Sequence, residues 1–239
     1  MKSIRLDKYI SSQTSFSRSE CRKLITTGRV RVEGLKWVNA DTKIDADDTK
    51  VFVDEKILGF KEYVYYLLNK PKGVLSASND KSKKTVIDLL GTETKHRQLF
   101  PVGRLDKDTT GLLIITDDGD IAHKIISPKS KIEKNYIAKL DGTPTQEDVK
   151  LFAEGVVLAD GTKCAPAVLE IISECNALIK ITEGKYHQIK RMFGVINLGV
   201  EELHRKSIGR MEIPANLQLG EYTEIQYQDI ESLIFCQKL

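Results

Sequence analysis

The sequence lacks the features that mark membrane, secreted and metal-binding proteins. Its 239 residues contain no apolar run of about eighteen residues, and the charged N-terminus has no apolar signal segment. Four scattered cysteines form no C-x-x-C pair, and they show no metal-ligand spacing with the four histidines. A glycine-rich phosphate loop and a dinucleotide fingerprint are also missing. We therefore expect a cytoplasmic protein that needs neither a metal nor an organic cofactor.

The composition is that of a folded protein, but its charge is unevenly distributed. The net charge is only +3, yet positions 1–36 hold nine basic residues against three acids. The basic residues are Lys2, Arg5, Lys8, Arg18, Arg22, Lys23, Arg29, Arg31 and Lys36. Positions 37–59 reverse the balance, with six acids against three lysines. A charge run alone is more often a solvated face, but this segregation is also typical of a protein with a polyanionic partner.

Residues 1–58 predict a small αβ domain, and residues 59–62 predict a short linker after it. Ser17 and Glu20 have the spacing of a capping box, in which the Ser hydroxyl and the Glu carboxylate satisfy free amides at a helix start. Gly28 is placed to end that helix in the left-handed conformation.

Residues 29–32 alternate basic and apolar side chains, which favours a strand, and residues 50–53 predict its returning partner. The strand arginines then share one face, and we expect the helix arginines to meet them in one basic patch. The predicted patch consists of Arg18, Arg22, Arg29 and Arg31.

The rest of the chain, residues 63–239, alternates short apolar runs with turns and a few helical patterns. Expected strands are 63–68, 112–115, 136–140, 167–172 and 177–182, and expected helices are 121–126, 146–155 and 229–236. Because strands in series are interspersed with helices and no regular βαβ repeat occurs, we predict an α+β fold with a largely antiparallel sheet.

The most informative segment surrounds Asp106. This acid follows Arg104-Leu105 and precedes a Thr-Thr-Gly sequence that we expect to turn, before the apolar strand at 112–115 and an Asp118-Gly119 turn. A carboxylate on a tight turn that enters a buried strand is held rigidly. Such rigidity favours a nucleophile or a base over a solubilising charge.

Two other motifs compete for the same segment. The Asp106-x-Asp108 spacing is that of an aspartyl-phosphate phosphatase, but that motif has its apolar strand before the first Asp. With Gly111 the segment also matches half an EF-hand loop, which needs a Glu at its twelfth position, where this chain has Asp117. A phosphatase would depend on magnesium.

Three further clusters carry candidate functional residues. Residues 69–73 end a strand with two lysines around a proline, and Tyr136 follows a basic residue at the start of another strand. The segment 181–193 runs from a strand through a glycine turn into a helix and gathers basic and aromatic side chains. Each has an ordinary alternative, since a strand tyrosine usually packs and a lone histidine is usually structural.

At this point the sequence resembles a known family. Gly103-Arg-Leu-Asp106 with Thr109-Thr-Gly-Leu-Leu113 is similar to the catalytic signature of the RNA pseudouridine synthases, and the resemblance extends over essentially the whole chain. Residues 1–58 resemble the S4 RNA-binding module, through Arg5-Leu-Asp-Lys-Tyr-Ile10, Ser17-Arg18 and the strand that follows Gly28. The resemblance implies two domains, of which the first grips structured RNA through phosphates and helix shape.

The resemblance also implies the roles of single residues. Asp106 would be the catalytic group that promotes cleavage of the C1′–N1 bond of a flipped-out uridine. Tyr136 would stack on the base and take the C5 proton, Ile189 would contact the base, and Lys190 would pair with Asp106 and keep it ionised. The implied RNA-binding residues are Arg104, Ile189, Lys185, His187 and Arg191 in the catalytic domain, and Arg5, Arg18, Arg22, Arg29 and Arg31 in the S4-like domain.

The segments 185–193 and 202–205 are similar to the small-subunit branch of the family, which implies 16S ribosomal RNA and its uridine at the 516 site as the target. A 23S target is the enzymatic alternative, and a non-catalytic ribosome-assembly factor is the alternative of another class. The substrate is naked ribosomal RNA or an assembling particle, with no membrane partner, and nothing in the sequence requires more than a monomer.

Overall fold

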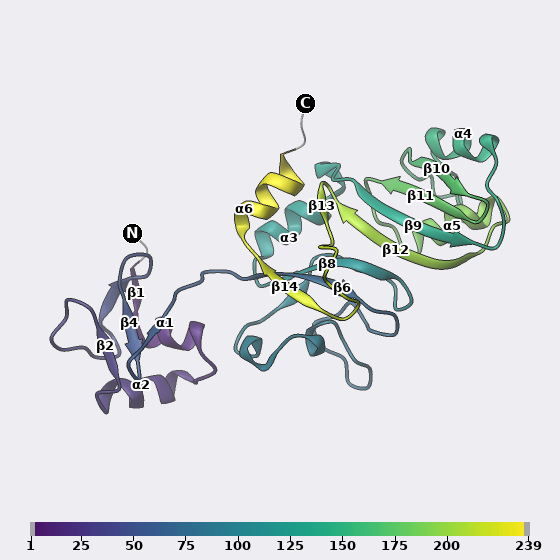
Figure 1. Cartoon of the computed structure of the whole chain (residues 1–239). Helices are drawn as coiled ribbons and strands as arrows, with labels where there is room; N and C mark the ends of the chain where they lie inside the picture. Colours follow the sequence, from purple (N-terminus) through teal and green to yellow (C-terminus); the bar gives the residue numbers. More distant parts are fainter. Residues whose placement is uncertain (1–2, 237–239) are drawn as a thin grey trace. The chain divides into compact units, whose positions relative to one another are not determined.

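The computed structural model describes residues 3–236 and divides them into two compact units (Figure 1). The first unit contains residues up to Tyr63 together with Gly91–Gln98, and the second contains Val64–Leu90 and the chain from Leu99 onward. The segment 91–98 therefore leaves the second unit and joins the first. The division into domains at 1–58, 59–62 and 63–239 stays a prediction.

The first unit is built from two short helices and five three-residue strands. Its elements are β1 (Ser3–Arg5), α1 (Leu6–Gln13), α2 (Arg18–Thr26), β2 (Val30–Val32), β3 (Lys43–Asp45), β4 (Val51–Val53) and β5 (Lys56–Leu58). Strand β1 pairs with β3, and β2, β4 and β5 form an antiparallel sheet. Leu6, Tyr9 and Ile10 of α1 pack with Cys21 and Leu24 of α2 in one core, because both helices place their apolar residues on one face.

The predicted start and end signals of α2 are confirmed. Ser17 accepts a hydrogen bond from the main-chain N–H of Glu20, whose carboxylate accepts one from the N–H of Ser17. Gly28 has a φ of +73°, the left-handed conformation that glycine adopts at low cost. Ile4 lies in β1, where it pairs with Ile44 of β3.

The second unit is built around one mixed sheet. Its strands are β6 (Tyr65–Lys70), β7 (Phe100–Pro101), β8 (Thr110–Thr116), β9 (Lys134–Leu140), β10 (Val168–Ser173), β11 (Asn176–Ile181), β12 (Val200–Ile208), β13 (Met211–Glu212) and β14 (Tyr222–Ile225). The order is β10-β11-β9-β12-β8-β6-β14, with β13 beside β12 and β7 beside β8. The β12–β8 pair is parallel and the other pairs are antiparallel, which confirms the α+β fold with a largely antiparallel sheet.

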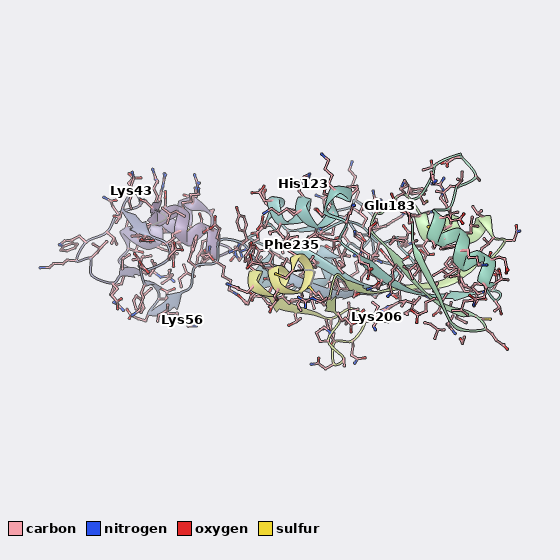
Figure 2. The ribbon with its side chains drawn as sticks, turned by 90° about the horizontal axis from the view of Figure 1, so that it is seen from above. Lys43, Lys56, His123, Glu183, Lys206 and Phe235 are labelled. Carbon is pink, nitrogen blue, oxygen red and sulfur yellow. The ribbon has the colours of Figure 1, made fainter. Side chains whose placement is uncertain are left out.

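Helices cover both faces of this sheet. They are α3 (Gly119–Ile126), α4 (Gln146–Glu154), α5 (Gln188–Val195) and α6 (Tyr227–Ile230), which continues as a π-helical turn over Glu231–Phe235. Short 3-10 turns cover Ile87–Leu89 and Pro128–Ser130 in this unit and Thr92–Thr94 in the first. Figure 2 labels His123 on α3 and Phe235 on the closing helix, which lie at the same end of the unit.

Strand β8 is buried on both faces. Leu113 and Ile115 belong to the core shared with α4 and α5, whereas Leu112 and Ile114 belong to the core shared with α3 and α6. This is why its sequence is a continuous apolar run and not an alternating one.

Two predicted turns around β8 are wrong. The strand already begins at Thr110, so the Thr-Thr-Gly sequence enters the strand. Asp118 is the N-cap of α3, where its carboxylate accepts hydrogen bonds from the N–H groups of Asp120 and Ile121. A capping Asp and a turn-forming Asp have the same local sequence preference, which explains the error.

Candidate active site

The turn that carries Asp106 is fixed by the neighbouring segments. The buried ammonium of Lys70, at the end of β6, donates to the main-chain carbonyls of Pro71, Asp106, Lys107 and Thr109 at 2.9–3.3 Å. The hydroxyl of Ser76 donates to the carbonyl of Leu105 at 2.8 Å. These bonds hold the segment before β8 in one conformation, as the sequence predicts for a functional carboxylate.

Asp106 lines a pocket of the second unit, and residues from four parts of the sequence complete it. The lining residues are Arg104, Leu105, Asp106, Thr109, Tyr136, Ile181, Gly184, Lys185, His187, Gln188, Ile189, Lys190 and Leu203. Seven of the residues predicted to form the site thus lie around one cavity: Arg104, Asp106, Tyr136, Lys185, His187, Ile189 and Lys190. The carboxylate is 28% exposed, so a ligand in the pocket can reach it.

The two acids of this turn have different partners. Nε2 of His187 lies 3.5 Å from Oδ1 of Asp106. Nζ of Lys190 instead lies 2.5 Å from Oδ2 of Asp108, and this hydrogen bond lowers the pKa of Asp108. The structure therefore corrects the predicted Lys190–Asp106 pair. His187 is the N-cap of α5 and Lys190 lies in its first turn. Sequence spacing alone therefore does not decide which of the two side chains faces which carboxylate.

Part of the pocket lining is apolar and buried. Ile181, Ile189 and Leu203 are each at most 6% exposed, and the ring of Tyr136 is 7% exposed. Nη1 of Arg205 donates to the hydroxyl of Tyr136 at 3.4 Å. A pocket lined by an acid together with apolar and aromatic groups suits a flat, partly polar ligand such as a nucleobase.

The loop between β11 and α5 presents the remaining basic residues. Gln188 accepts a hydrogen bond from the N–H of Lys185 at 2.9 Å and donates one to Glu183 at 2.8 Å (Glu183 is labelled in Figure 2). Lys185 forms an ion pair with Glu183. The loop enters α5 through His187, whose φ of +47° is uncommon for a residue other than glycine. His187 thereby turns toward Asp106.

Arg191 lies outside the pocket lining, although it was predicted to bind RNA beside it. Its guanidinium forms an ion pair with Asp160 and donates to the carbonyl of Tyr186. Tyr186, which sequence analysis left without a role, is 74% exposed, and its ring stacks on that of His187 at 3.9 Å. An exposed aromatic beside the pocket is visible only once the fold places it there.

The five predicted RNA-binding arginines of the first unit fall into separate groups. Arg5 and Arg22 both pair with the buried carboxylate of Asp7, whose pKa is lowered chiefly by the hydrogen bond from Arg5. Arg29 binds Asp54 through two hydrogen bonds, and the guanidinium of Arg31 lies 3.7 Å from the ring centroid of Phe52. Arg18, at the first position of α2, is exposed to solvent. Much of the predicted basic patch is therefore neutralised within the unit.

Two buried cations contact residues of the pocket, and neither had a predicted role there, although both lie in segments that the sequence singles out, 69–73 and 202–205. Lys70 and Arg205 are 0% and 2% exposed. The signal for Lys70 was a basic residue at the end of an otherwise buried strand, which requires a compensating partner, whereas β12 has several exposed residues and gives no such signal for Arg205. Among residues 3–236, the helices are all too short or too polar to cross a bilayer.

Comparison with known proteins agrees with this geometry. A family model described as RNA pseudouridylate synthase matches residues 64–194, and an S4 domain model matches residues 4–49. An RNA pseudouridine synthase of Bacillus subtilis, itself uncharacterised, is 36% identical over 234 residues, covering 96% of this chain and 98% of that protein. The ribosomal small subunit pseudouridine synthase A of Escherichia coli K12 is 37% identical over 234 residues, covering 97% and 100%.

A solved structure is similar over the same length. A crystal structure of a pseudouridylate synthase superposes with a TM-score of 0.68 at 33% sequence identity, covering 97% of this chain and 100% of that one. The family suggested by the Asp106 signature and by the N-terminal module is therefore confirmed. The chain belongs to the RNA pseudouridine synthases, in the branch that carries an N-terminal S4 domain, and is an enzyme of that family.

Proposed function

We propose that this enzyme converts one uridine of small-subunit ribosomal RNA to pseudouridine, at the 516 site of 16S RNA, with Asp106 as its catalytic group. The observation that carries this proposal is that Asp106, a partly exposed carboxylate on a turn held by buried hydrogen bonds, lines one pocket together with Tyr136 and Ile189. The small-subunit target is supported by two relatives, of Escherichia coli and Haemophilus influenzae, that are named ribosomal small subunit pseudouridine synthase A.

The target uridine must leave the helix stack, because its glycosidic bond is otherwise out of reach. Asp106 then promotes cleavage of the C1′–N1 bond, by attack on C1′ or by assisting elimination to a glycal. The detached uracil turns within the pocket and rejoins through C5. Tyr136 stacks on the base and takes the C5 proton, while Ile189 contacts the base and Arg104 helps to hold the RNA strand open.

Two basic residues at the start of α5 lie beside the two acids of the turn. His187 faces Asp106, and Lys190 holds Asp108, two residues further along the same turn. The hydrogen bond from Lys190 lowers the pKa of the Asp108 carboxyl and so favours its ionised form. Lys185 and Arg191 flank the pocket and contribute to phosphate binding.

The S4 domain binds structured RNA through its phosphates. Arg18 is the arginine most available for contact. The other four exchange their partners within the domain for phosphates: Arg5, Arg22, Arg29 and Arg31. We further propose that the protein acts as a monomer in the cytoplasm, where ribosomes are assembled. The reaction is an isomerisation, and we propose that it proceeds without a metal or an organic cofactor.

The test is tritium release from RNA labelled with 5-³H-uridine, without added metal. The substrates are 16S transcript, 23S transcript and partly assembled small-subunit particles, each with wild type and Asp106→Asn. Release by wild type alone, and from small-subunit substrates alone, supports the proposal. Release from 23S RNA alone overturns the target. An equal rate for Asp106→Asn overturns the role of Asp106, and absence of release from every substrate with RNA binding intact favours a non-catalytic assembly factor.

A further inference from the structure

A buried arginine lies against the tyrosine of the pocket. Arg205, in β12, is 2% exposed. Its Nε donates to the carbonyl of Leu112 at 2.7 Å, and its Nη1 donates to the hydroxyl oxygen of Tyr136 at 3.4 Å. Its Cζ lies 6.0 Å from the centroid of the tyrosine ring. The guanidinium therefore contacts the hydroxyl of the side chain that we propose to face the base.

This charge has no counterion within residues 3–236. No carboxylate pairs with Arg205 there, and its Nη2 is buried without a hydrogen-bond partner. Burying an unpaired charge is costly, and an apolar side chain of similar size would fill the same space at a lower cost. A role confined to packing does not explain a guanidinium at this position.

Two further buried cations accompany Arg205. Lys70 and Lys134 are 0% and 8% exposed, and the pKa of each is lowered to about 8, chiefly by burial and in part by the charge of Arg205. On the pocket side the charged or titratable groups are Arg104, Asp106, Lys185, His187 and Lys190. Of these three buried cations, Arg205 is the one whose hydrogen bond reaches the hydroxyl of Tyr136, a residue that lines the pocket.

We propose that Arg205 is a positioning residue that makes the Tyr136 oxygen a proton acceptor, and this inference rests on the proposed function. A hydrogen bond from a guanidinium stabilises the phenolate more than the phenol. Once uracil has rejoined through C5, the C5–H bond breaks and its proton goes to the Tyr136 oxygen. The electron pair of that bond forms the C5=C6 double bond, the N1=C6 pair moves to N1, and N1 takes a proton from solvent. The phenol later returns its own proton to solvent.

The step assigned to the Arg205–Tyr136 pair can be separated from the earlier ones. RNA containing 5-fluorouridine has no C5 proton, so its consumption by C1′–N1 cleavage does not need a base at C5. Arg205→Met and Arg205→Lys are compared with Lys206→Met, a variant of the next residue of β12, which pairs with Glu212 at 3.3 Å (Lys206 is labelled in Figure 2).

We expect Arg205→Met to slow tritium release from 5-³H-uridine RNA roughly 100-fold, as for loss of a general base, and to leave consumption of 5-fluorouridine unchanged. The isotope effect with 5-²H-uridine should rise above that of wild type, because proton removal becomes the slow step. Arg205→Lys, which keeps the charge, should lie between wild type and Arg205→Met, and Lys206→Met should match wild type.

Equal slowing of both substrates, or no slowing of either, would overturn the inference, because a structural role does not distinguish a proton from fluorine at C5. If circular dichroism shows that Arg205→Met does not fold, the same comparison with Arg205→Lys decides the matter. A wild type that releases no tritium from any ribosomal RNA overturns the proposed function and this inference with it. An active wild type with equal slowing overturns this inference alone.

Discussion

The ammonium of Lys70 donates a hydrogen bond to the main-chain carbonyl of Asp106 at 3.1 Å. The lysine enters the site from β6 and binds the backbone of the turn, so it orients the candidate catalytic acid without contacting its carboxylate. Lys70→Gln should therefore lower stability by about 2–3 kcal/mol and lower kcat on the order of 100-fold, with little change in KM. Urea unfolding and single-turnover kinetics measure the two effects.

Lys72→Gln is the matched control for that variant. Lys72 belongs to the same Lys-Pro-Lys segment but is half exposed and pairs with Glu202 at the surface. Its removal should change stability by less than about 1 kcal/mol. If Lys70→Gln behaved like Lys72→Gln, the buried hydrogen bonds would not fix the turn.

Gly111 marks the place where β8 and β12 approach most closely. A Cβ added there would lie 2.3 Å from the carbonyl oxygen of Arg205, and the φ of Gly111 is +109°. Gly111→Ala must therefore separate the two strands, and we expect it to cost about 3 kcal/mol or more. Gly119→Ala, in a position with no neighbour within 4 Å, should be nearly neutral. Thermal unfolding of both variants checks this contrast, and equal melting temperatures would contradict it.

Lys134 should give the protein a distinctive pH dependence. Burial lowers its folded-state pKa from 10.5 to about 8, so between pH 8 and 10.5 the unfolded chain binds more protons than the folded one. The contribution of Lys134 to stability then rises with pH across this window. The gain in the free energy of unfolding from Lys134→Met should be larger at pH 7.5 than at pH 10, by about 2 kcal/mol. Urea titrations at the two pH values test this, and a difference independent of pH would refute it.

Arg18 and Arg29 should contribute differently to RNA binding. Arg18 is exposed at the start of α2, whereas Arg29 is held by Asp54. Arg18→Ala should lower the slope of log K against log salt concentration by about 1, as for one lost phosphate contact, and Arg29→Ala by less. Binding to 16S RNA at several salt concentrations gives both slopes. An unchanged slope for both variants would exclude them from the RNA interface.

The exposed ring of Tyr186 should matter for substrate binding. Stacked on His187 beside the pocket, it offers a platform for a base of the RNA. Tyr186→Ala should raise KM about tenfold, the value of one base–aromatic contact, and Tyr186→Phe should leave it unchanged. Equal effects of the two substitutions would point to the hydroxyl and not to the ring.

The sequence predicts the elements of this fold better than it predicts their partners. The capping box of α2 and the buried run of β8 are local signals, and both are confirmed. The pairing of Lys190 with Asp108 depends on how α5 meets the turn before β8, across 82 residues of sequence, and no local pattern encodes it. The same holds for Arg29, whose binding to Asp54 only the returning strand reveals.

The pocket is complete only after β12 has paired with β8. This parallel pair joins Thr110 to His204, which are 94 residues apart, and Leu203 of β12 is one wall of the pocket. Contacts between such distant positions form slowly, because a long loop must close first. During synthesis, the segment that carries Asp106 emerges long before its partner strand. A growing chain therefore acquires the whole candidate pocket only after β12 has been synthesised, and a chain that stops before β12 has Asp106 without the Leu203 wall.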